Sequence, residues 1–387
     1  MEKWFFFLYS FIVTILYVLA LPFLFFLSFK SKYKYSIPAR FFLKNNAPLS
    51  SHGIWFHVCS FGEAKAIKPL VEVLPKESLR MSTTTQTGFD AMSNYTHERA
   101  YLPFEPLLFG WMKPQKVLLV MEAEFWYLLF ALSQRRATKT LLINARISDR
   151  SYPKYMRMRW LYKQIFKHID EVYAQTVLDR ERLESLGATN VVVTGNIKLS
   201  QLPSVTRRFV KPSGLVVCAA STHEGEEELI LEAFKDFKEE YEDATLIIAP
   251  RHPERFSKVT SLIENQGVSW HRFSKDIGFE SDIVLVDAMG ELVNVYAISD
   301  IVILGGAFVP VGGHNAAEAA QFGCKIISGP HYFNQKDIFE AVEGITIVEA
   351  AHLSHKLSQH GLLESTYIKN KSNLTPIIKS IQGSLNK

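Results

Sequence analysis

Short apolar runs alternate with amphipathic stretches along most of this chain, and this alternation restricts the fold more than any other feature of the sequence. Segments 54–59, 117–121 and 216–220 are almost entirely apolar, which is typical of strands buried on both faces of a parallel sheet. The amphipathic stretches between them predict helices. The pattern is interrupted at 203–212, where no periodicity is visible, and then begins again. We therefore predict two doubly wound α/β domains joined by a linker.

The N-terminal segment is apolar in a different way. From Trp4 to Phe29 the sequence contains no charged residue, so the segment is long enough to cross a bilayer as a helix. It lacks the short apolar core and the small-residue cleavage site of a signal peptide. The basic residues that follow it are Lys30, Lys32, Lys34, Arg40 and Lys44. Because only Lys3 precedes the segment, the positive-inside rule places the remaining chain in the cytoplasm, behind an anchor that spans the membrane or lies in its surface.

These features divide the chain into three parts. We predict a membrane anchor at 1–34, an N-terminal Rossmann-like domain at 35–204 and a C-terminal Rossmann-like domain at 205–387, whose last helix can pack back on the N-terminal domain. In such domains ligands bind at the carboxyl ends of the strands.

Cysteine usage and charge narrow the class of protein further. The three cysteines Cys59, Cys218 and Cys324 are widely spaced in apolar stretches, which predicts reduced thiols rather than disulfides or a structural zinc site. The net charge is +4, but segment 146–167 alone holds seven Lys/Arg and one acid, interleaved with aromatic residues. Beside a membrane anchor, this segment favours an anionic lipid surface over nucleic acid, with a solvated helix face as the alternative.

One strand end carries a carboxylate whose role the sequence leaves open. Ser60 and Glu63 have the S-x-x-E spacing of a capping box at the start of a predicted helix. A carboxylate on a strand-to-helix turn also lies where a doubly wound domain binds its ligand, and there it can accept a proton. Both interpretations fit the local sequence.

Polar clusters also follow nearly all of the remaining predicted strands. In the first half they comprise Ser60, Gly62, Glu63, Thr83, Thr84, Thr85, Glu122, Glu124, Arg146, Ser148, Arg150 and Lys198. In the second half they comprise Ser221, Thr222, His223, Arg251, His252, Met289, Gly290, Glu291, Gly312, Gly313, His314, Asn315 and Glu318.

The clusters of the second half have the chemistry of a nucleotide site. Ser221 and Thr222 precede a predicted helix whose N-terminus suits a phosphate, although Ser221 also has the spacing of a cap with Glu224. Glu318 follows a glycine-rich turn, where a carboxylate can hold the two hydroxyls of a ribose or form a cap with Asn315. Arg251 suits a phosphate or a carboxylate, with a surface ion pair as the alternative.

Metal and dinucleotide motifs are missing from the sequence. The glycine-rich stretch is neither a Walker A loop nor a dinucleotide fingerprint, and there is no H-E-x-x-H or D-x-D motif. We predict no metal ion and no other cofactor.

Taken together, these stretches resemble the bacterial 3-deoxy-D-manno-octulosonic acid (Kdo) transferases of lipopolysaccharide biosynthesis. The resemblance runs in order through "WFHVCSFGE", "TTTQTG", "EAEFW", "NARISDRSY", "TGNIK", "AASTHEGEEE", "APRHPER", "DAMGEL", "GGAFVPVGGHNAAE" and "SGPHYFN". It implies a GT-B glycosyltransferase with two Rossmann-like domains facing a cleft, preceded by the anchor helix. It also implies transfer of Kdo from CMP-Kdo to the lipid A precursor lipid IVA at the inner membrane, with inversion and without a metal.

The resemblance also assigns roles to the polar clusters. Glu63 becomes the catalytic base, and we expect the N-terminus of its helix to keep it ionised. The second-half residues become the donor site, with Met289–Glu291 near the cytosine. The other first-half residues become the acceptor site. Tyr127-Leu128 replaces the usual Pro-Asn, the usual "HNPLEP" becomes "HNAAEA", and Glu105 replaces an aspartate, which changes an expected acceptor contact.

Two alternatives remain at this point. One is another GT-B nucleotide-sugar enzyme, such as a UDP-sugar transferase or an epimerase, which would bind UDP rather than CMP. The other is a non-catalytic binder of anionic glycolipid, in which Glu63 and Glu318 would be helix caps.

Overall fold

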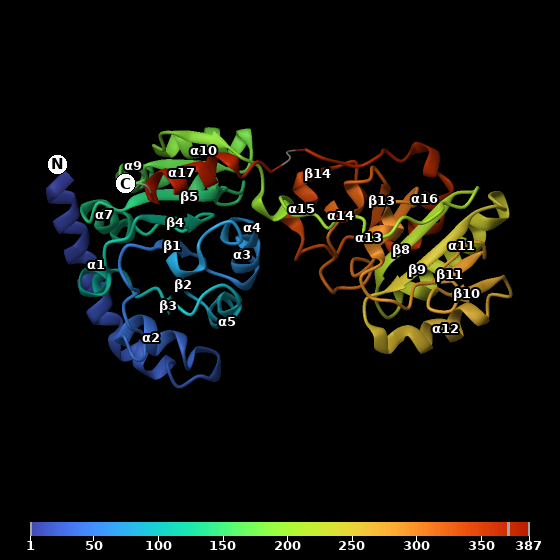
Figure 1. The fold of residues 1–387 in the computed structure, drawn as a ribbon, viewed down its shortest axis with the longest axis horizontal. Coiled ribbons are helices and arrows are strands. Elements are labelled where there is room, and N and C mark those ends of the chain that lie inside the picture. Colours follow the sequence, from blue (N-terminus) through green and yellow to red (C-terminus); the bar gives the residue numbers. More distant parts are fainter. Residues whose placement is uncertain (1, 370–371, 386–387) are drawn as a thin grey trace. The chain divides into compact units, whose positions relative to one another are not determined.

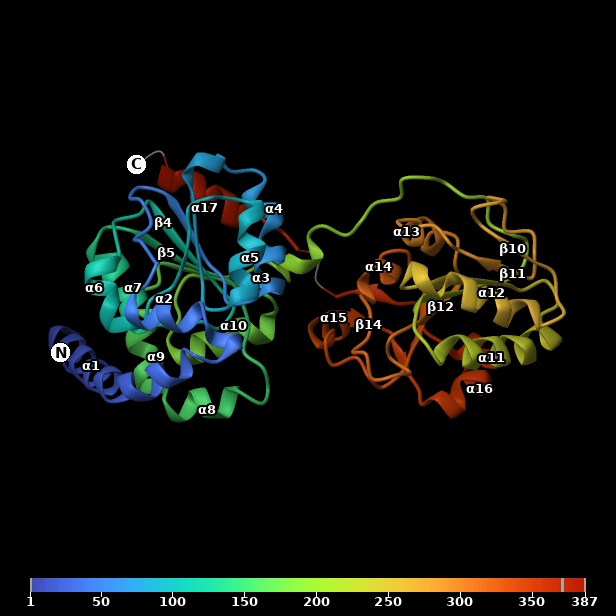
Figure 2. The same ribbon diagram turned by 90° about the horizontal axis from the view of Figure 1, so that it is seen from below.

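The computed structural model describes residues 2–369 and 372–385 and separates the chain into two units (Figures 1 and 2). Unit 1 comprises Met1–Gln201 and Asn370–Lys387, and unit 2 comprises Leu202–Lys369. The segment 203–212, which we expected to be a linker, lies at the start of unit 2 and contains no helix or strand.

Unit 1 is built on a seven-stranded sheet in the order β3-β2-β1-β4-β5-β6-β7, in which neighbouring strands are parallel. The strands are β1 Ile54–His57, β2 Leu79–Thr83, β3 Arg99–Tyr101, β4 Val117–Met121, β5 Lys139–Ala145, β6 Glu171–Ala174 and β7 Val191–Val193. The order reverses direction at β1, so the ends of β1 and β4 flank the switch point of the sheet, where doubly wound domains bind ligands.

Helices cover both faces of this sheet. They are α1 Glu2–Leu27, α2 Ser36–Phe42, α3 Phe61–Ala66, α4 Lys68–Val71, α5 Gln86–Ala91, α6 Leu108–Trp111, α7 Tyr127–Arg135, α8 Tyr152–Arg157, α9 Arg159–Phe166, α10 Val177–Leu186 and α17 Thr375–Leu385. Successive strand residues point to opposite faces, so Trp55 joins the core with α7 and α9, whereas Ile54 and Phe56 join the core with α3 and α17.

The last helix, α17, belongs to unit 1 although it follows the whole of unit 2 in the sequence (Figures 1 and 2). Its residues Ile377 and Ile381 are fully buried in the unit 1 core. The Ser380 hydroxyl donates a 2.6 Å hydrogen bond to Oε2 of Glu171, on β6. Both apolar and polar contacts therefore attach the end of the chain to the first sheet.

The apolar helix α1 rests on unit 1 through its first turns. Phe6 is buried in the core, and the Tyr9 ring packs edge-on against Tyr127 at a centroid distance of 4.7 Å. The Tyr9 hydroxyl donates a 2.7 Å hydrogen bond to Glu105, whose other carboxylate oxygen accepts the amide of Leu128 at 2.6 Å. Glu105 is 4% exposed, and through these two bonds it joins α1 to α7.

The opposite face of α1 is covered with exposed apolar side chains. They include Trp4, Phe7, Phe11, Ile15, Leu16, Leu19, Phe23 and Phe26. The segment Lys3–Leu27 is long and apolar enough to cross a membrane, and an 18-residue stretch within it has a mean hydropathy of 2.5. One face of a membrane-length helix is thus fixed to a folded domain while the other faces outward.

Unit 2 repeats the architecture with a second parallel sheet in the order β10-β11-β9-β8-β12-β13-β15. Its strands are β8 Val216–Thr222, β9 Thr245–Pro250, β10 Trp270–Arg272, β11 Ile283–Leu285, β12 Ile301–Leu304, β13 Lys325–Ser328 and β15 Thr346–Ile347. A small antiparallel pair, β14 Val342–Glu343 and β16 Tyr367–Ile368, lies beside it.

The helices of unit 2 are α11 Glu226–Glu240, α12 Phe256–Glu264, α13 Leu292–Tyr296, α14 Ala317–Ala320, α15 Lys336–Ala341 and α16 Leu353–Ser358. Residues of α11, α12 and α16 form one core with alternate residues of the strands, such as Val217 and Ile303. The predicted fold class is confirmed: two Rossmann-like doubly wound units with a single long apolar helix at the N-terminus.

Candidate functional site

Glu63 lies just beyond the end of β1, on the first turn of α3. Ser60 is the N-cap of α3, and its Oγ accepts the Glu63 amide at 3.2 Å. The Ser60 hydroxyl in turn donates to Oε1 of Glu63 at 3.0 Å, and the Cys59 amide donates to Oε2 at 2.8 Å. A capping arrangement therefore exists, but the glutamate accepts the amide of Cys59 rather than that of the cap residue itself.

Burial raises the pKa of Glu63 to about 7. The negative charges of Glu122 and Glu124 raise it further, while the hydrogen bonds from Cys59 and Ser60 oppose the shift. The expectation that the helix N-terminus keeps Glu63 fully ionised is therefore wrong, because desolvation outweighs the local donors. A carboxyl with a pKa near neutral is a stronger base than an ordinary glutamate and is still partly ionised at pH 7.

The neighbouring strand ends bring more polar groups to the same edge of the sheet. Glu122 and Asn144 directly follow the paired residues Met121 and Ile143, and both have left-handed backbones with φ of 56° and 52°. Glu122 also forms an ion pair with Lys198, with 3.4 Å between the nearest atoms.

The Asn144 side chain connects the same edge to the segment after β7. Its Oδ1 accepts the amide of Ile197 at 3.0 Å. Asn144 was not among the predicted site residues. Its place at the end of an apolar strand, next to the predicted Arg146, was the available signal.

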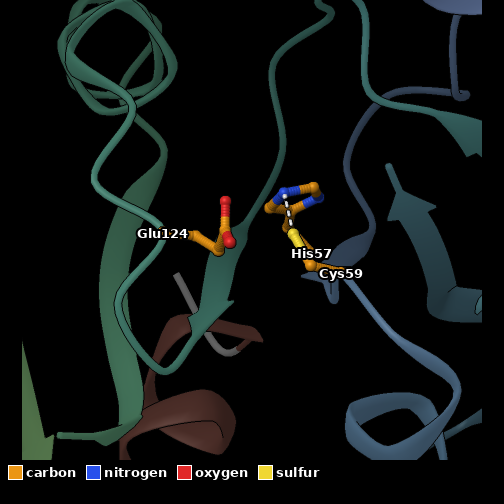
Figure 3. Close-up of side chains that lie close together, drawn as sticks. All are labelled: His57, Cys59 and Glu124. Carbon is orange, nitrogen blue, oxygen red and sulfur yellow. Dashed lines mark hydrogen bonds between the residues drawn. The ribbon is translucent and has the colours of Figure 1, made fainter. Parts of the chain in front are cut away.

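A second group of polar atoms surrounds the segment before Glu63. The ring of His57, the thiol of Cys59 and the carboxylate of Glu124 place ligand-type atoms within 4.8 Å of one another (Figure 3). The Nε2 of His57 lies 3.6 Å from Sγ of Cys59, and Glu124 also accepts the indole N–H of Trp126 at 2.8 Å.

This group has the donor types of a metal site, but a positive charge already lies beside it. Burial lowers the pKa of His57 to about 3, and the nearby Arg40 lowers it further. Burial also lowers the pKa of Arg40, and the interactions of Arg40 with Cys59 and Glu124 oppose that shift. A divalent cation bound by His57, Cys59 and Glu124 would be repelled by the guanidinium. The geometry therefore favours a hydrogen-bonded cluster balanced by Arg40.

The threonine-rich loop after β2 contacts the Glu63 segment directly. Thr85 is the N-cap of α5, and its hydroxyl donates to the carbonyl of Cys59 at 2.8 Å. Thr84 also interacts with the Cys59 thiol, and Thr83 is fully buried. The structure thus brings the threonine loop and Glu63 together.

The residues predicted after β5 are placed less closely. Ser148 and Arg150 are exposed in the loop before α8, where the Ser148 hydroxyl bonds to Ser151. Arg146 is half-buried at the end of β5, and Gly62 is exposed on α3. Ser148 and Arg150 therefore lie at the periphery of the site and not in the Glu63 cluster.

In unit 2 the predicted donor residues converge on a pair of histidines. The Nε2 atoms of His223 and His314 lie 2.9 Å apart, and their rings stack at 5.2 Å. The ring of His252 meets His223 edge-on at 5.4 Å, and the amide of Arg251 donates to the carbonyl of Thr222 at 3.0 Å. These residues come from the ends of β8 and β9 and from the glycine-rich turn after β12.

Electrostatics keep this histidine pair neutral. Burial lowers the pKa of His314 to about 4, and the nearby His223, Arg251 and His252 lower it further. Burial also lowers the pKa of His223; the negative charge of Glu226 opposes this shift, while His252 and Arg251 add to it. An anion bound among these groups would raise the pKa values of both histidines. Protonation of a histidine would then supply a positive charge next to the anion.

The alternative interpretation of Ser221 and Glu224 as a helix cap is wrong. Ser221 lies in a bulge of β8 with φ of 56°, and α11 begins later, at Glu226 with Gly225 as its N-cap. Glu224 is exposed and forms an ion pair with Lys258. The backbone of this bulge packs closely against Gly305 in the neighbouring loop, where a Cβ would lie 2.5 Å from the carbonyl oxygen of Ser221.

The remaining donor candidates lie at the start of α13 and α14. Met289 is exposed, Gly290 has φ of 88°, and Glu291 accepts a 2.7 Å bond from Asn294. Oε1 of Glu318 accepts the side-chain amide of Asn315 at 3.1 Å, so the expected contact between these two residues exists. Gly312 and Gly313 form the turn that leads to His314, and both donate their amides to the carbonyl of Gly306.

Known proteins are similar to this chain over nearly its whole length. Residues 35–201 match the family model described as 3-Deoxy-D-manno-octulosonic-acid transferase (kdotransferase). The chain is 32% identical to the 3-deoxy-D-manno-octulosonic acid transferase of Haemophilus influenzae, over 93% of this chain and 91% of that protein. It is 28% identical to the protein of the same name from Aquifex aeolicus, over 84% of this chain and 91% of that protein.

Two solved structures are also similar. One is the C-terminal CMP-Kdo binding domain of WaaA from Acinetobacter baumannii, with 28% identity, 45% of this chain and 88% of that chain covered, and a TM-score of 0.36. The other is the UDP-GlcNAc 2-epimerase of Neisseria meningitidis, with 12% identity, 85% of this chain and 99% of that chain covered, and a TM-score of 0.48.

Proposed function

Because the chain belongs to the 3-deoxy-D-manno-octulosonic acid (Kdo) transferase family and is a Kdo glycosyltransferase, we propose that it transfers Kdo from CMP-Kdo to lipid IVA, with inversion at the anomeric carbon. The observation that carries the mechanism is the state of Glu63, a half-buried carboxyl at the switch point of the unit 1 sheet with a pKa of about 7.

Glu63 acts as the general base in this proposal. An acceptor hydroxyl attacks the anomeric carbon of Kdo, its proton passes to a carboxylate oxygen of Glu63, and the bond from that carbon to the phosphate of CMP breaks. The bonds from Cys59 and Ser60 fix both oxygens of Glu63, which orients the base before the acceptor arrives. Most of the rate enhancement comes from this positioning and from stabilisation of the departing phosphate.

The donor binds to unit 2. His223, His314 and Arg251 surround a place where an anion is favoured, because burial and mutual repulsion keep the histidines neutral until a negative charge arrives. We assign the phosphate of CMP-Kdo to this group, together with Ser221 and His252. The predicted contact from the Thr222 hydroxyl is left out, because Thr222 is fully buried and its hydroxyl donates to Oε1 of Glu227 at 2.9 Å. Glu318 binds the ribose hydroxyls, and the exposed segment at Met289–Glu291 contacts the cytosine.

The acceptor binds to unit 1 and reaches it from a membrane. The polar groups next to Glu63, among them Glu122, Lys198 and the threonine loop, suit a sugar with many hydroxyls. The outward face of α1 and the basic helices α8 and α9 attach the protein to an anionic bilayer surface. The Phe5 ring lies 6.2 Å from the exposed Trp160 of α9, so the two membrane-facing elements adjoin.

The experiment that tests this function measures the product by mass. The protein is incubated with lipid IVA and CMP-Kdo that is generated in place, and a parallel reaction contains a UDP-sugar. We expect the mass of the acceptor to increase by whole Kdo residues only in the first reaction. An unchanged acceptor in the first reaction, or transfer from the UDP-sugar, contradicts the proposal. Binding of CMP without any transfer would instead favour a non-catalytic glycolipid binder.

A further inference from the structure

A buried glutamate lies behind the histidine pair of unit 2. Glu226, on the first turn of α11, is fully buried, and its carboxylate accepts five backbone amides. Oε2 accepts the amides of His223 at 2.9 Å and Gly306 at 2.8 Å. Oε1 accepts the amides of Ala307, Phe308 and Val309 at 3.1, 2.9 and 3.4 Å.

Consecutive amides that converge in this way form an anion-binding nest. In many proteins such a nest after a strand holds the phosphate of a ligand. Here the carboxylate of Glu226 fills the nest at 306–309 from within the fold. A phosphate of the donor therefore has no access to these four amides unless Glu226 is displaced, and it must be bound by side chains instead.

Glu226 also connects the two histidines. It holds His223 directly through the backbone amide of that residue. It holds His314 indirectly, through Gly306, whose amide donates to Glu226. The carbonyl of Gly306 accepts the amides of Gly312 at 3.0 Å and Gly313 at 2.7 Å, the two residues before His314. One carboxylate thus fixes the strand end that carries one ring and the turn that carries the other.

We propose that Glu226 is a positioning residue that sets the His223–His314 pair for the anion of the donor, by filling the amide nest that would otherwise compete for that anion. This inference rests on the proposed binding of CMP-Kdo to unit 2. The inference adds to the proposed function that side chains hold the phosphate, and that Glu226 permanently occupies the amides of the loop at 306–309.

The matched variants are Glu226→Gln and Glu228→Gln. Glu228 lies on the same turn of α11 but is exposed, so its amide variant controls for charge and helix position. Glutamine at 226 turns an N–H2 group toward amides that need an acceptor, which disrupts the nest. Glu226→Asp keeps the charge and is expected to retain more of the donor affinity than Glu226→Gln.

The measurements are the dissociation constant of CMP by calorimetry and the KM values for donor and acceptor. We expect Glu226→Gln to weaken CMP binding about tenfold or more and to raise the KM for CMP-Kdo, with the KM for the acceptor unchanged and Glu228→Gln equal to wild type. Wild-type affinity for CMP in a folded Glu226→Gln protein overturns the inference. Failure of the wild-type protein itself to bind CMP counts against the proposed donor instead.

A measurement on the unmodified protein covers the case in which Glu226→Gln does not fold. Hydrogen exchange is followed at the amides of 306–309, with and without CMP. If Glu226 fills the nest, these loop amides are protected from exchange in the free protein, and CMP adds little further protection. Rapid exchange that slows when CMP binds would show that the nest is open and takes the phosphate, and it would overturn the inference.

Discussion

The backbone amide of Cys59 donates a 2.8 Å hydrogen bond to Oε2 of Glu63. This contact joins the end of β1 to the side chain that we propose as the base. Glu63 therefore takes part in the local structure of the turn, in addition to the role in catalysis that we propose for it. The structural and chemical roles of this residue are therefore separable only by substitutions that keep one and remove the other.

The first prediction concerns Glu63→Gln. Glutamine retains a carbonyl oxygen for the Cys59 amide and an amide that can donate to Ser60, so the turn is preserved. It does not accept the proton of the acceptor hydroxyl. We expect a melting temperature near that of wild type at pH 4.5 and no lower than that of wild type at higher pH, with unchanged CMP affinity and a loss of about two to four orders of magnitude in turnover. Transfer assays and thermal melts on the same preparation measure both effects.

The control for this variant is Glu77→Gln, a substitution of an exposed glutamate in the same unit. It should keep full activity. If Glu63→Gln transfers Kdo as fast as Glu77→Gln, then Glu63 is a cap and not the base.

The second prediction is the pH dependence of the reaction. The base must be ionised to accept a proton, and burial raises the pKa of Glu63 to about 7. Activity should therefore increase with pH and level off above about pH 7, as kcat/KM reports the free enzyme. An ordinary glutamate would give a rate that is already constant from about pH 5.5 upward. A flat profile between pH 5.5 and 8 would exclude Glu63 as the titrating base.

The third prediction is the effect of the same group on stability. Because the folded state raises the pKa of Glu63 from 4.5 to about 7, folding favours the protonated carboxyl. This contribution to stability is complete below pH 4.5 and is lost as the pH rises to about 7. Glutamine does not titrate, so the Glu63→Gln variant does not lose this stability as the pH rises. Its free energy of unfolding should therefore increase by roughly 2–3 kcal/mol relative to that of wild type between pH 4.5 and pH 8. Urea unfolding at both pH values measures this difference, and a constant difference would contradict the raised pKa.

Much of the fold could be predicted because buried parallel strands must be apolar. The apolar run at 117–121 is β4, and the run at 216–220 lies within β8. The site edge could also be located, since ligands bind at the carboxyl ends of such strands. The threonine loop and Glu63 do meet there, through the bond from Thr85 to the carbonyl of Cys59.

The features that could not be predicted depend on residues far apart in the sequence. The raised pKa of Glu63 comes from burial and from Glu122 and Glu124, whereas the sequence shows only the local helix N-terminus. In the run of glutamates at 226–228, the sequence does not show that Glu226 and Glu227 are buried while Glu228 is exposed. The carboxylate of Glu226 accepts amides of the loop after β12, about 80 residues further along the chain, and Glu227 pairs with Arg255.

The fourth prediction separates nucleotide binding from capping at Glu318. Its Oε1 accepts the side-chain amide of Asn315. If Glu318 binds the ribose, Glu318→Ala should weaken CMP affinity by roughly 1.5–3 kcal/mol, whereas Asn315→Ala should have a smaller effect because it leaves the carboxylate in place. Calorimetry with CMP on both variants decides between the roles. Equal losses, or none in Glu318→Ala, would mean that Glu318 only holds the side chain of Asn315 at the start of α14.

The fifth prediction concerns the attachment of the protein to membranes by the outward face of α1. Phe11 and Leu19 are exposed on that face, whereas Phe6 and Tyr9 hold the helix to unit 1. Deleting the whole helix would also remove core residues, so substitutions on the outward face are the sharper test. Phe11→Ser with Leu19→Ser should leave the fold intact. It should weaken binding to lipid vesicles by about 3 to 6 kcal/mol, roughly a hundredfold or more, since each side chain loses its burial in the bilayer.

The matched comparison is Lys154→Ser with Arg157→Ser on α8. These substitutions remove only electrostatic attraction, so their effect should appear on anionic vesicles at low salt and disappear at high salt. The α1 variant, in contrast, should lose binding at every salt concentration and on neutral vesicles as well. Vesicle sedimentation at two ionic strengths, with melting curves as a check on folding, distinguishes the two contributions. Wild-type sedimentation of the α1 variant at high salt would mean that the outward face of α1 does not enter the bilayer.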